Sequence, residues 1–183
     1  MKKNPMLIGM VGALLLVVLS LIIPRFFQQK KLDFIIDNPT HQTIEVQIDA
    51  EKYTLKPLGQ VVVSLKTGTH TLNQKDTFNI DFIHHGVINP TQSTYFLYKK
   101  YYGSVAKRDS IFKNAPILDW KGKKIQFTDT TSAVFIQDFY YNLNEDFPVW
   151  TNANSVKDSL KNDSRVKIFR ENDFQNFYKN ENP

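Results

Sequence analysis

The chain has no cysteine and few glycines, and each shortage excludes a class of site. With no cysteine among 183 residues, the chain can form no disulfide, thiolate metal site or cysteine nucleophile, and it cannot be a lipoprotein lipidated on cysteine at a processed signal. Its 7 glycines form no glycine-rich phosphate loop, and no Gly-x-Ser-x-Gly motif occurs. We therefore expect no nucleotide and no cofactor.

An excess of positive charge is also missing from most of the chain. Of the 23 Lys and Arg residues, five precede the first acid, Asp33, so residues 32–183 carry 18 cations and 18 acids. A nucleic-acid-binding domain usually has a basic surface, and a formally neutral domain lacks that signal. We expect no nucleic-acid partner.

What the chain does contain is a long apolar run near its N-terminus. Residues 6–23 carry no charge, and as a helix they would span about 27 Å, close to the hydrocarbon thickness of a bilayer. This pattern predicts a transmembrane anchor over residues 1–25 and a short tether over residues 26–31. A cleaved signal peptide is the alternative, but apolar residues continue past Ser20 and favour a retained anchor.

Basic residues flank this segment on both sides and nearly balance. Lys2 and Lys3 precede it, and Arg25, Lys30 and Lys31 follow it. A very short basic stub before a first hydrophobic segment favours an N-terminus inside the cell. We expect the lipid bilayer as one partner, and residues 32–183 on the extracytoplasmic (periplasmic) side of a bacterial cell membrane.

The region after the tether has the periodicity of strands. Residues 43–48 alternate between apolar and polar side chains, which is typical of a half-buried strand. Turn sequences at 37–40 and 57–59 separate further short strands, and 66–69 predicts a hairpin turn between strands at 61–65 and 70–72. The predicted fold is mainly β: a small antiparallel sandwich-like domain, with a few short helices toward the C-terminus.

Part of this region resembles a known family of small β domains. The residues involved are Val46 to Ala50, Tyr53 to Pro57, and Val62 to His70 with its Gly-x-His hairpin. They are similar to PEGA-type domains of bacterial envelope proteins, over residues 32–83. The motif that names that family is missing, and Ala50 stands where a glycine is expected. The resemblance implies display or binding in the envelope and carries over no catalytic residue.

The second half of the chain is less regular. We expect a buried strand over 133–141, a helical turn from Ser155, and a helix near Asn172 that carries Phe174, Phe177 and Tyr178 on one face. We interpret residues 32–183 as one domain with a possible soft boundary near 86–90. The tripeptide Asn-Pro-Thr occurs at 38–40 and again at 89–91, either as ordinary turn chemistry, which we favour, or as a paired loop surface.

Two polar clusters are candidates for chemistry. His84 and His85 are adjacent, so in a strand their side chains point to opposite faces and cannot bind one metal ion. Asn142, Asn144, Glu145 and Asp146 could bind Ca²⁺ or supply a general acid, but they lack the spacing of a calcium loop and favour a plain loop. We therefore expect no metal site and no catalytic residue.

The middle of the chain concentrates positive charge. Between residues 99 and 124 there are eight cations and two acids, interleaved with aromatic residues. Cations beside aromatics suit an anionic glycan, a phospholipid headgroup or an acidic protein, although solvated turns and core aromatics explain the same pattern. The candidate binding residues, which we call the basic and aromatic residues, are Lys99, Lys100, Tyr101, Tyr102, Lys107, Arg108, Trp120, Lys121, Lys123 and Lys124.

Two hypotheses follow from these patterns. The first is a membrane-anchored extracytoplasmic protein that binds or scaffolds an envelope protein or a glycan and has no enzymatic activity. The alternative is an envelope hydrolase that uses carboxylates near Asp138, Glu145 and Asp146. The sequence favours the first hypothesis because no catalytic motif rises above background.

Overall fold

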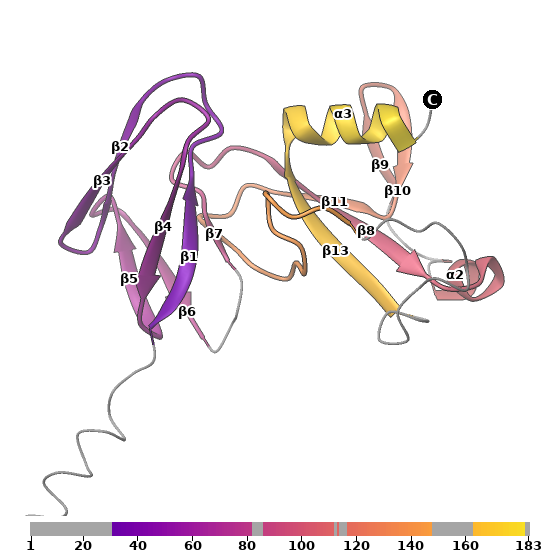
Figure 1. The fold of residues 1–183 in the computed structure, drawn as a ribbon, viewed down its shortest axis with the longest axis horizontal. Coiled ribbons are helices and arrows are strands. Elements are labelled where there is room, and N and C mark those ends of the chain that lie inside the picture. The colour runs from indigo at the N-terminus through magenta and orange to yellow at the C-terminus, as the bar shows by residue number, and fades with distance from the viewer. Residues whose placement is uncertain (1–30, 82–85, 112, 114–116, 148–162, 182–183) are drawn as a thin grey trace, which may run out of the picture.

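The computed structural model describes residues 31–81, 86–111, 113, 117–147 and 163–181. The prediction of a mainly β chain is confirmed, with several small sheets and a short helix near the C-terminus (Figure 1). The predicted anchor, the histidine pair at 84–85 and the helical turn from Ser155 lie outside the described residues. None of the helices in the described ranges is long and apolar enough to cross a membrane.

Two four-stranded sheets form the first lobe. One has the order β12-β7-β1-β4, with β1 at Leu32–Asp37, β4 at Gln60–Leu65, β7 at Val87–Ile88 and β12 at Phe135–Ile136. The other has the order β3-β2-β5-β6, with β2 at Ile44–Ile48, β3 at Glu51–Leu55, β5 at Gly68–Leu72 and β6 at Asp76–Ile80.

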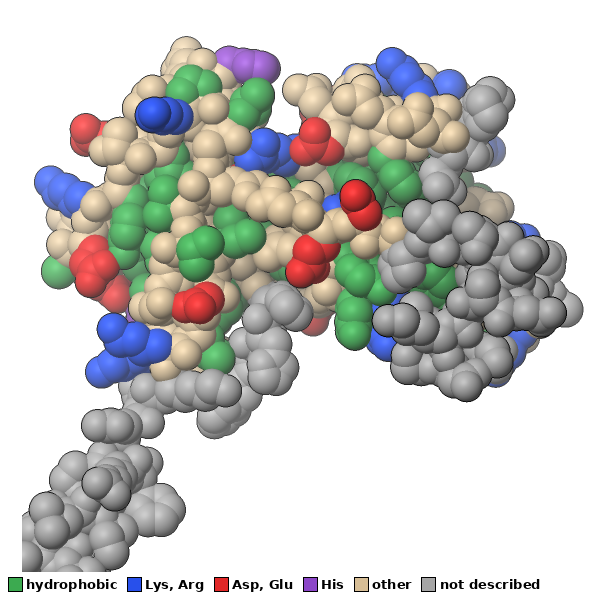
Figure 2. Space-filling model, viewed as in Figure 1, with side chains coloured by type: hydrophobic (Ala, Val, Ile, Leu, Met, Phe, Trp, Pro, Cys, Tyr) green, Lys and Arg blue, Asp and Glu red, His purple; other side chains and the backbone are tan. Residues whose placement is uncertain are grey.

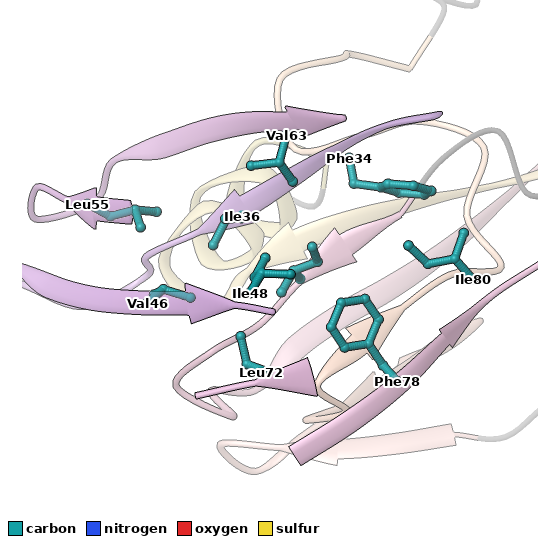
Figure 3. Close-up of a cluster of buried hydrophobic side chains, with 10 residues drawn as sticks. Phe34, Ile36, Val46, Ile48, Leu55, Val63, Leu72, Phe78 and Ile80 are labelled. Carbon is teal, nitrogen blue, oxygen red and sulfur yellow. The ribbon is translucent and has the colours of Figure 1, made fainter. Parts of the chain in front are cut away.

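The two sheets share one apolar core (Figure 3). Alternation along each strand places every second side chain on the inner face, so the predicted pattern of β2 appears as buried Val46 and Ile48. The buried cluster consists of Phe34, Ile36, Val46, Ile48, Leu55, Val63, Leu72, Phe78, Ile80 and Ile88.

Two pairings in this lobe differ from the prediction. Strands β1 and β7 are parallel, so the lobe is not wholly antiparallel. The segment at 66–67 is not a hairpin turn, because β4 pairs with β1 while β5 pairs with β6 and β2. The chain crosses there from one sheet to the other, and both flanking strands bury their apolar faces in the same core.

A three-stranded sheet, a hairpin and two helices form the second lobe. The sheet has the order β11-β8-β13, with β8 at Tyr95–Tyr102, β11 at Thr128–Thr131 and β13 at Asp163–Arg170. The hairpin joins β9, Ile117–Trp120, to β10, Lys123–Gln126, and the helices are α2, Val105–Ile111, and α3, Glu171–Glu181.

Helix α3 covers the three-stranded sheet with the aromatic stripe that the sequence predicts. Phe174 is fully buried and stacks on Phe96 of β8 with ring centroids 4.6 Å apart. Phe177 lies 4.8 Å from the ring of Phe169 on β13. This burial fixes α3 on the sheet of the second lobe, directly after β13 ends at Arg170.

Residues 133–141 do not form the long strand that the sequence predicts. Phe135 and Ile136 pair with β7, and Tyr141 forms an isolated bridge with Lys167 of β13. Between these two pairings the backbone of Asp138 turns to a positive φ of 70°. The left-handed conformation interrupts the extended chain at this point. Ile136 instead packs with Val87, Tyr95, Phe139 and Ile168 in a small core that joins the two lobes.

Candidate functional site

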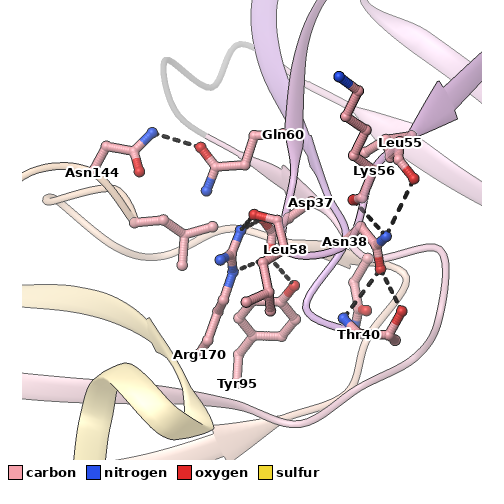
Figure 4. Close-up of polar contacts among 12 residues, drawn as sticks. Asp37, Asn38, Thr40, Leu55, Lys56, Leu58, Gln60, Tyr95, Asn144 and Arg170 are labelled. Atoms are coloured by element: carbon pink, nitrogen blue, oxygen red, sulfur yellow. Dashed lines mark hydrogen bonds and ion pairs between the residues drawn. The ribbon is translucent and has the colours of Figure 1, made fainter. Parts of the chain in front are cut away.

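A buried acid and a basic residue meet where the two lobes join. Asp37, the last residue of β1, has no exposed surface, and its carboxylate accepts two hydrogen bonds from the guanidinium of Arg170, one of them from Nε at 2.9 Å (Figure 4). The hydroxyl of Tyr95 donates a third bond to the same carboxylate at 2.6 Å. Three strands from both lobes are thereby tied together.

The pKa shifts at this centre keep the Tyr95 hydroxyl protonated and the Arg170 guanidinium charged, as their hydrogen bonds to Asp37 require. Burial, and then the nearby Asp37, raise the pKa of the Tyr95 hydroxyl well above its ordinary value, so Tyr95 remains a donor. The hydrogen bonds that Arg170 donates to the carboxylate of Asp37 raise the pKa of Arg170, which remains a cation. The charge of Arg170 is thus already matched within the protein.

A strained turn lies beside Arg170. Gly59 N donates to Lys56 O at 2.9 Å, and Leu58, inside this turn, has a φ of 56°. That conformation usually favours glycine. Here the amide of Leu58 donates to Thr40 O at 3.0 Å, and its carbonyl accepts from Arg170 Nη2 at 3.1 Å. These bonds hold the apolar side chain of Leu58 43% exposed.

The two Asn-Pro-Thr tripeptides form similar loops at the same end of adjacent strands. Asn38 and Asn89 are both fully buried, and they follow the parallel strands β1 and β7. Asn38 Nδ2 donates to the carbonyl four residues on, Gln42 O, at 2.7 Å, and Asn89 Nδ2 likewise donates to Ser93 O at 2.8 Å. The repeated tripeptide therefore builds two loops side by side.

These loops, the Leu58 turn and the start of α3 surround a pocket of about 370 Å³. Figure 2 shows the surface hollowed between the two lobes beside α3, with acidic and basic side chains near the hollow. We call it the inter-lobe pocket, and it is lined by Pro39, His41, Leu58, Ser93, Thr94, Arg170, Glu171, Asn172 and Asp173. The sequence did not predict this pocket, although the repeated Asn-Pro-Thr was its one visible signal.

The pocket has room for a small group or a side chain, and the described contacts of its lining residues include no arrangement for nucleophilic catalysis. The hydroxyl of Ser93 hydrogen-bonds to that of Thr91 at 2.8 Å, and among the described residues no base bonds to it. Apolar Leu58 and Pro39 and the carboxylates of Glu171 and Asp173 line the same space.

The structure distributes the basic and aromatic residues over three elements of the second lobe. Lys99, Lys100, Tyr101 and Tyr102 lie on β8, Lys107 and Arg108 on α2, and Trp120 to Lys124 on the β9–β10 hairpin. Tyr102 is buried, and Trp120 packs edge-on against Phe96 and Phe174. These two aromatics therefore contribute to the core.

Several cations of this set contact groups of the protein itself. Lys121 Nζ lies 4.6 Å from the ring centre of Trp120 and 3.4 Å from Glu171 Oε1. Lys123 Nζ lies 5.8 Å from the ring centre of Tyr178, and the side chain of Arg108 pairs with Asp109 at 2.9 Å. All of Lys121, Lys123 and Lys124 remain exposed at the hairpin.

The loop with Asn142, Glu145 and Asp146 is stabilised by a lysine from β13. Lys167 is 4% exposed, and its ammonium donates to Asn142 O at 2.8 Å, Leu143 O at 3.3 Å and Glu145 O. The ammonium is thus the cation that these carbonyls contact. Burial lowers the pKa of Lys167, and the nearby carboxylate of Asp146 opposes that shift.

The carboxylates of the alternative hydrolase have structural partners or stand exposed. Glu145 Oε2 accepts the amide of Asn142 at 2.8 Å within its own loop, while Asp138 and Asp146 are exposed. Ser104 and Lys107 have the Ser-x-x-Lys spacing of some hydrolases, but the Ser104 hydroxyl accepts the amide of Lys107 at 3.4 Å at the start of α2. It acts there as a helix cap.

His70, on β5, contacts two other groups of the fold through its ring nitrogens. His70 Nδ1 lies 2.7 Å from Asp49 Oδ2, and its Nε2 lies 2.9 Å from Lys66 O. Among the described residues, no three His, Asp or Glu side chains gather as metal ligands would.

No protein-family model, curated protein or solved structure matches this chain significantly.

Proposed function

We propose that this protein is a membrane-anchored, extracytoplasmic binding or scaffolding protein of the bacterial cell envelope, without enzymatic activity. The observation that carries the binding role is the inter-lobe pocket, which takes its lining from both lobes. Leu58 supports this role, because its strained backbone keeps an apolar side chain exposed there. A partner protein or a glycan is the expected ligand.

The anchored location rests on residues 6–23 and the short tether at 26–31, which extends to about 20 Å at most. The binding surfaces would then lie close to the membrane. Because the chain has no cysteine, one cysteine introduced at exposed Asn176 can be labelled with a maleimide that does not cross membranes. Labelling of intact spheroplasts supports the proposed side, and labelling only after lysis contradicts it.

The binding role is tested by recovery of partners from envelope fractions. We expect Leu58→Asp to reduce recovery of a partner held in the inter-lobe pocket. Triple reversal of Lys121, Lys123 and Lys124 to Glu tests the basic and aromatic residues, with Lys52, Lys56 and Lys75 reversed as the matched control in the first lobe. If Leu58→Asp and the reversal of Lys121, Lys123 and Lys124 both recover the same proteins and glycans as the parent chain, binding at these surfaces is contradicted.

No described contact favours the alternative hydrolase, because Glu145 caps its own loop and Ser104 caps α2. The amide variants Glu145→Gln and Asp146→Asn separate the two hypotheses. A hydrolase would lose activity and retain its fold, and a binding protein would retain its partners.

A further inference from the structure

Strand β4 is a sheet edge that carries no charged side chain. Its 6 residues read Gln-Val-Val-Val-Ser-Leu, and it ends its sheet with β1 on one side only. Charges on edge strands usually prevent pairing with other chains. Among the described edge strands of four or more residues, each of the others carries at least one charge: β3, β6, β9, β10, β11 and β13.

The hydrogen-bond register shows which backbone groups of β4 face the open side. Asn38 N bonds to Gly59 O at 3.0 Å, whereas Ile35 N turns away from β4 to Gly86 O at 3.3 Å. Hydrogen-bonded and non-hydrogen-bonded pairs alternate in an antiparallel ladder, so Val62, opposite Ile35, belongs to a non-hydrogen-bonded pair. The amides and carbonyls of Gln60, Val62 and Ser64 therefore point outward.

Those outward groups are available to another strand. No backbone bond to Gln60, Val62 or Ser64 occurs among the described residues. The side chains of the same residues lie on the outer face of the sheet, where Val62 is 66% exposed beside half-buried Ile35. Within the described part of the chain, the edge thus presents backbone groups that have no strand partner, together with an exposed apolar side chain.

We propose that β4 pairs with β4 of a second copy of this chain, antiparallel and with Val62 on the two-fold axis. In this register, Val62 faces Val62 of the second copy, and Gln60 faces Ser64 of the second copy at both ends. The strand is self-complementary, because apolar meets apolar, polar meets polar and no like charges are opposed. The sheet then continues through both copies, and Ile35 and Val62 of each form one apolar row.

The size of this contact predicts where the dimer forms. One pair of short strands buries less than the roughly 1,200 Å² of a stable interface, so pairing is weak in dilute solution. Anchoring both copies in one membrane raises their effective concentration. Only this increase rests on the proposed anchor; the pairing itself rests on β4. If the paired strands lie parallel to the membrane plane, β1 begins at the same distance from the membrane in both copies, so both tethers can reach it.

The test uses the cysteine-free full chain in detergent and in native membranes, with one cysteine introduced. We expect Val62→Cys to form a disulfide-linked dimer under copper phenanthroline, because facing residues have Cα atoms about 5.5 Å apart. The matched control is Ser64→Cys on the same strand. The two Ser64 positions are about 13 Å apart in this register and cannot bridge.

A mixture of Gln60→Cys and Ser64→Cys chains tests the register, and we expect it to form a mixed dimer. Adding Val62→Lys to both chains should reduce the yield at least fivefold, because two ammonium groups meet on the axis. Thr54→Lys on the edge strand β3 should leave the yield unchanged. Circular dichroism monitors folding of each variant.

Three results would overturn the proposal. One is monomeric Val62→Cys chain in native membranes. The second is Ser64→Cys chain that cross-links as well as Val62→Cys, which indicates random collision. The third is cross-linking of Val62→Cys to a different protein, which assigns the edge to another partner. None of these results depends on which side of the membrane the lobes occupy, so the proposed location is tested separately.

Discussion

Arg170 and Asp37 are separated by 133 residues, yet the guanidinium of Arg170 forms a two-bond ion pair with the carboxylate of Asp37. Arg170 ends β13 and Asp37 ends β1, so the pair joins the two lobes through the ends of their strands. The same guanidinium donates to the carbonyl of Leu58. One residue therefore holds both the junction and a wall of the inter-lobe pocket.

Removing the acid of this pair should be strongly destabilising. We expect Asp37→Ala to lower the free energy of unfolding by about 3–5 kcal/mol, because Arg170 would remain as a partly buried, unmatched charge. Urea denaturation measures the change. Asp109→Ala removes an exposed pair with Arg108 and should cost less than about 1 kcal/mol. Equal costs for the two variants would contradict a buried, energetically important pair.

The two Asn-Pro-Thr loops should depend on their asparagines to a similar extent. Asn38 Nδ2 contacts Lys56 O at 2.8 Å as well as Gln42 O, and Asn89 Nδ2 contacts Ala133 O at 3.2 Å as well as Ser93 O. We expect Asn38→Ala and Asn89→Ala each to cost about 2–4 kcal/mol in urea denaturation, because buried carbonyls lose their donors. Asn79→Ala, at an exposed site, serves as the control, and a comparable loss there would refute the argument.

Lys167 should be required for the loop at 142–146. We expect Lys167→Met to lower the free energy of unfolding by about 3 kcal/mol, because the new side chain fills the space but leaves three carbonyls without a donor. Hydrogen exchange should rise in this loop and remain unchanged in β2. Lys99→Met, on the neighbouring strand, is the comparison. If Lys167→Met left the free energy of unfolding unchanged, the carbonyl contacts would add no stability.

The contact of Asp49 with His70 predicts a dependence of stability on acid. Burial alone would raise the pKa of Asp49, but the amide of Thr71 and the ring of His70 outweigh it and hold the pKa below its ordinary value. When the pKa of a carboxyl group is lower in the folded state, the group stabilises the fold at every pH above its unfolded-state pKa, which is about 3.9 for Asp. This contribution is lost as the pH falls through the folded-state pKa.

Unfolding measured between pH 7 and pH 2 tests this dependence. Asp49→Asn should be less stable than the parent chain near neutral pH, and the difference should shrink as the solution is acidified. Glu45→Gln, on strand β2, controls for the loss of any carboxylate. A difference that is constant with pH would contradict the proposed cause.

Local patterns predicted the parts of the fold that depend on local burial. Alternation at 43–48 indicated β2, and the spacing of Phe174, Phe177 and Tyr178 indicated α3, because each pattern places apolar side chains on one face. The pattern failed for β13, where Lys167 and Arg165 interrupt the apolar residues. Lys167 is buried only because distant carbonyls receive its ammonium, and no local signal carries that information.

The site was harder to predict for the same reason. Asp37 belonged to an ordinary turn sequence, and nothing near Arg170 marked it as its partner. Leu58 occupies a backbone conformation that usually favours glycine, and the atoms that hold it come from Thr40 and Arg170. Only the repeated Asn-Pro-Thr was visible beforehand, and its two copies became neighbours through the parallel pairing of β1 with β7.

By itself, the sequence determined the cysteine-free chemistry, the neutral charge of residues 32–183, the apolar run at 6–23 and the mainly β class, because composition and short-range alternation set each of these. Tertiary structure decided which strands pair, that β4 is left as an uncharged edge, and that Asp37, Tyr95 and Arg170 converge beside the inter-lobe pocket. These outcomes depend on contacts between residues far apart in the chain, whose energies no local pattern records.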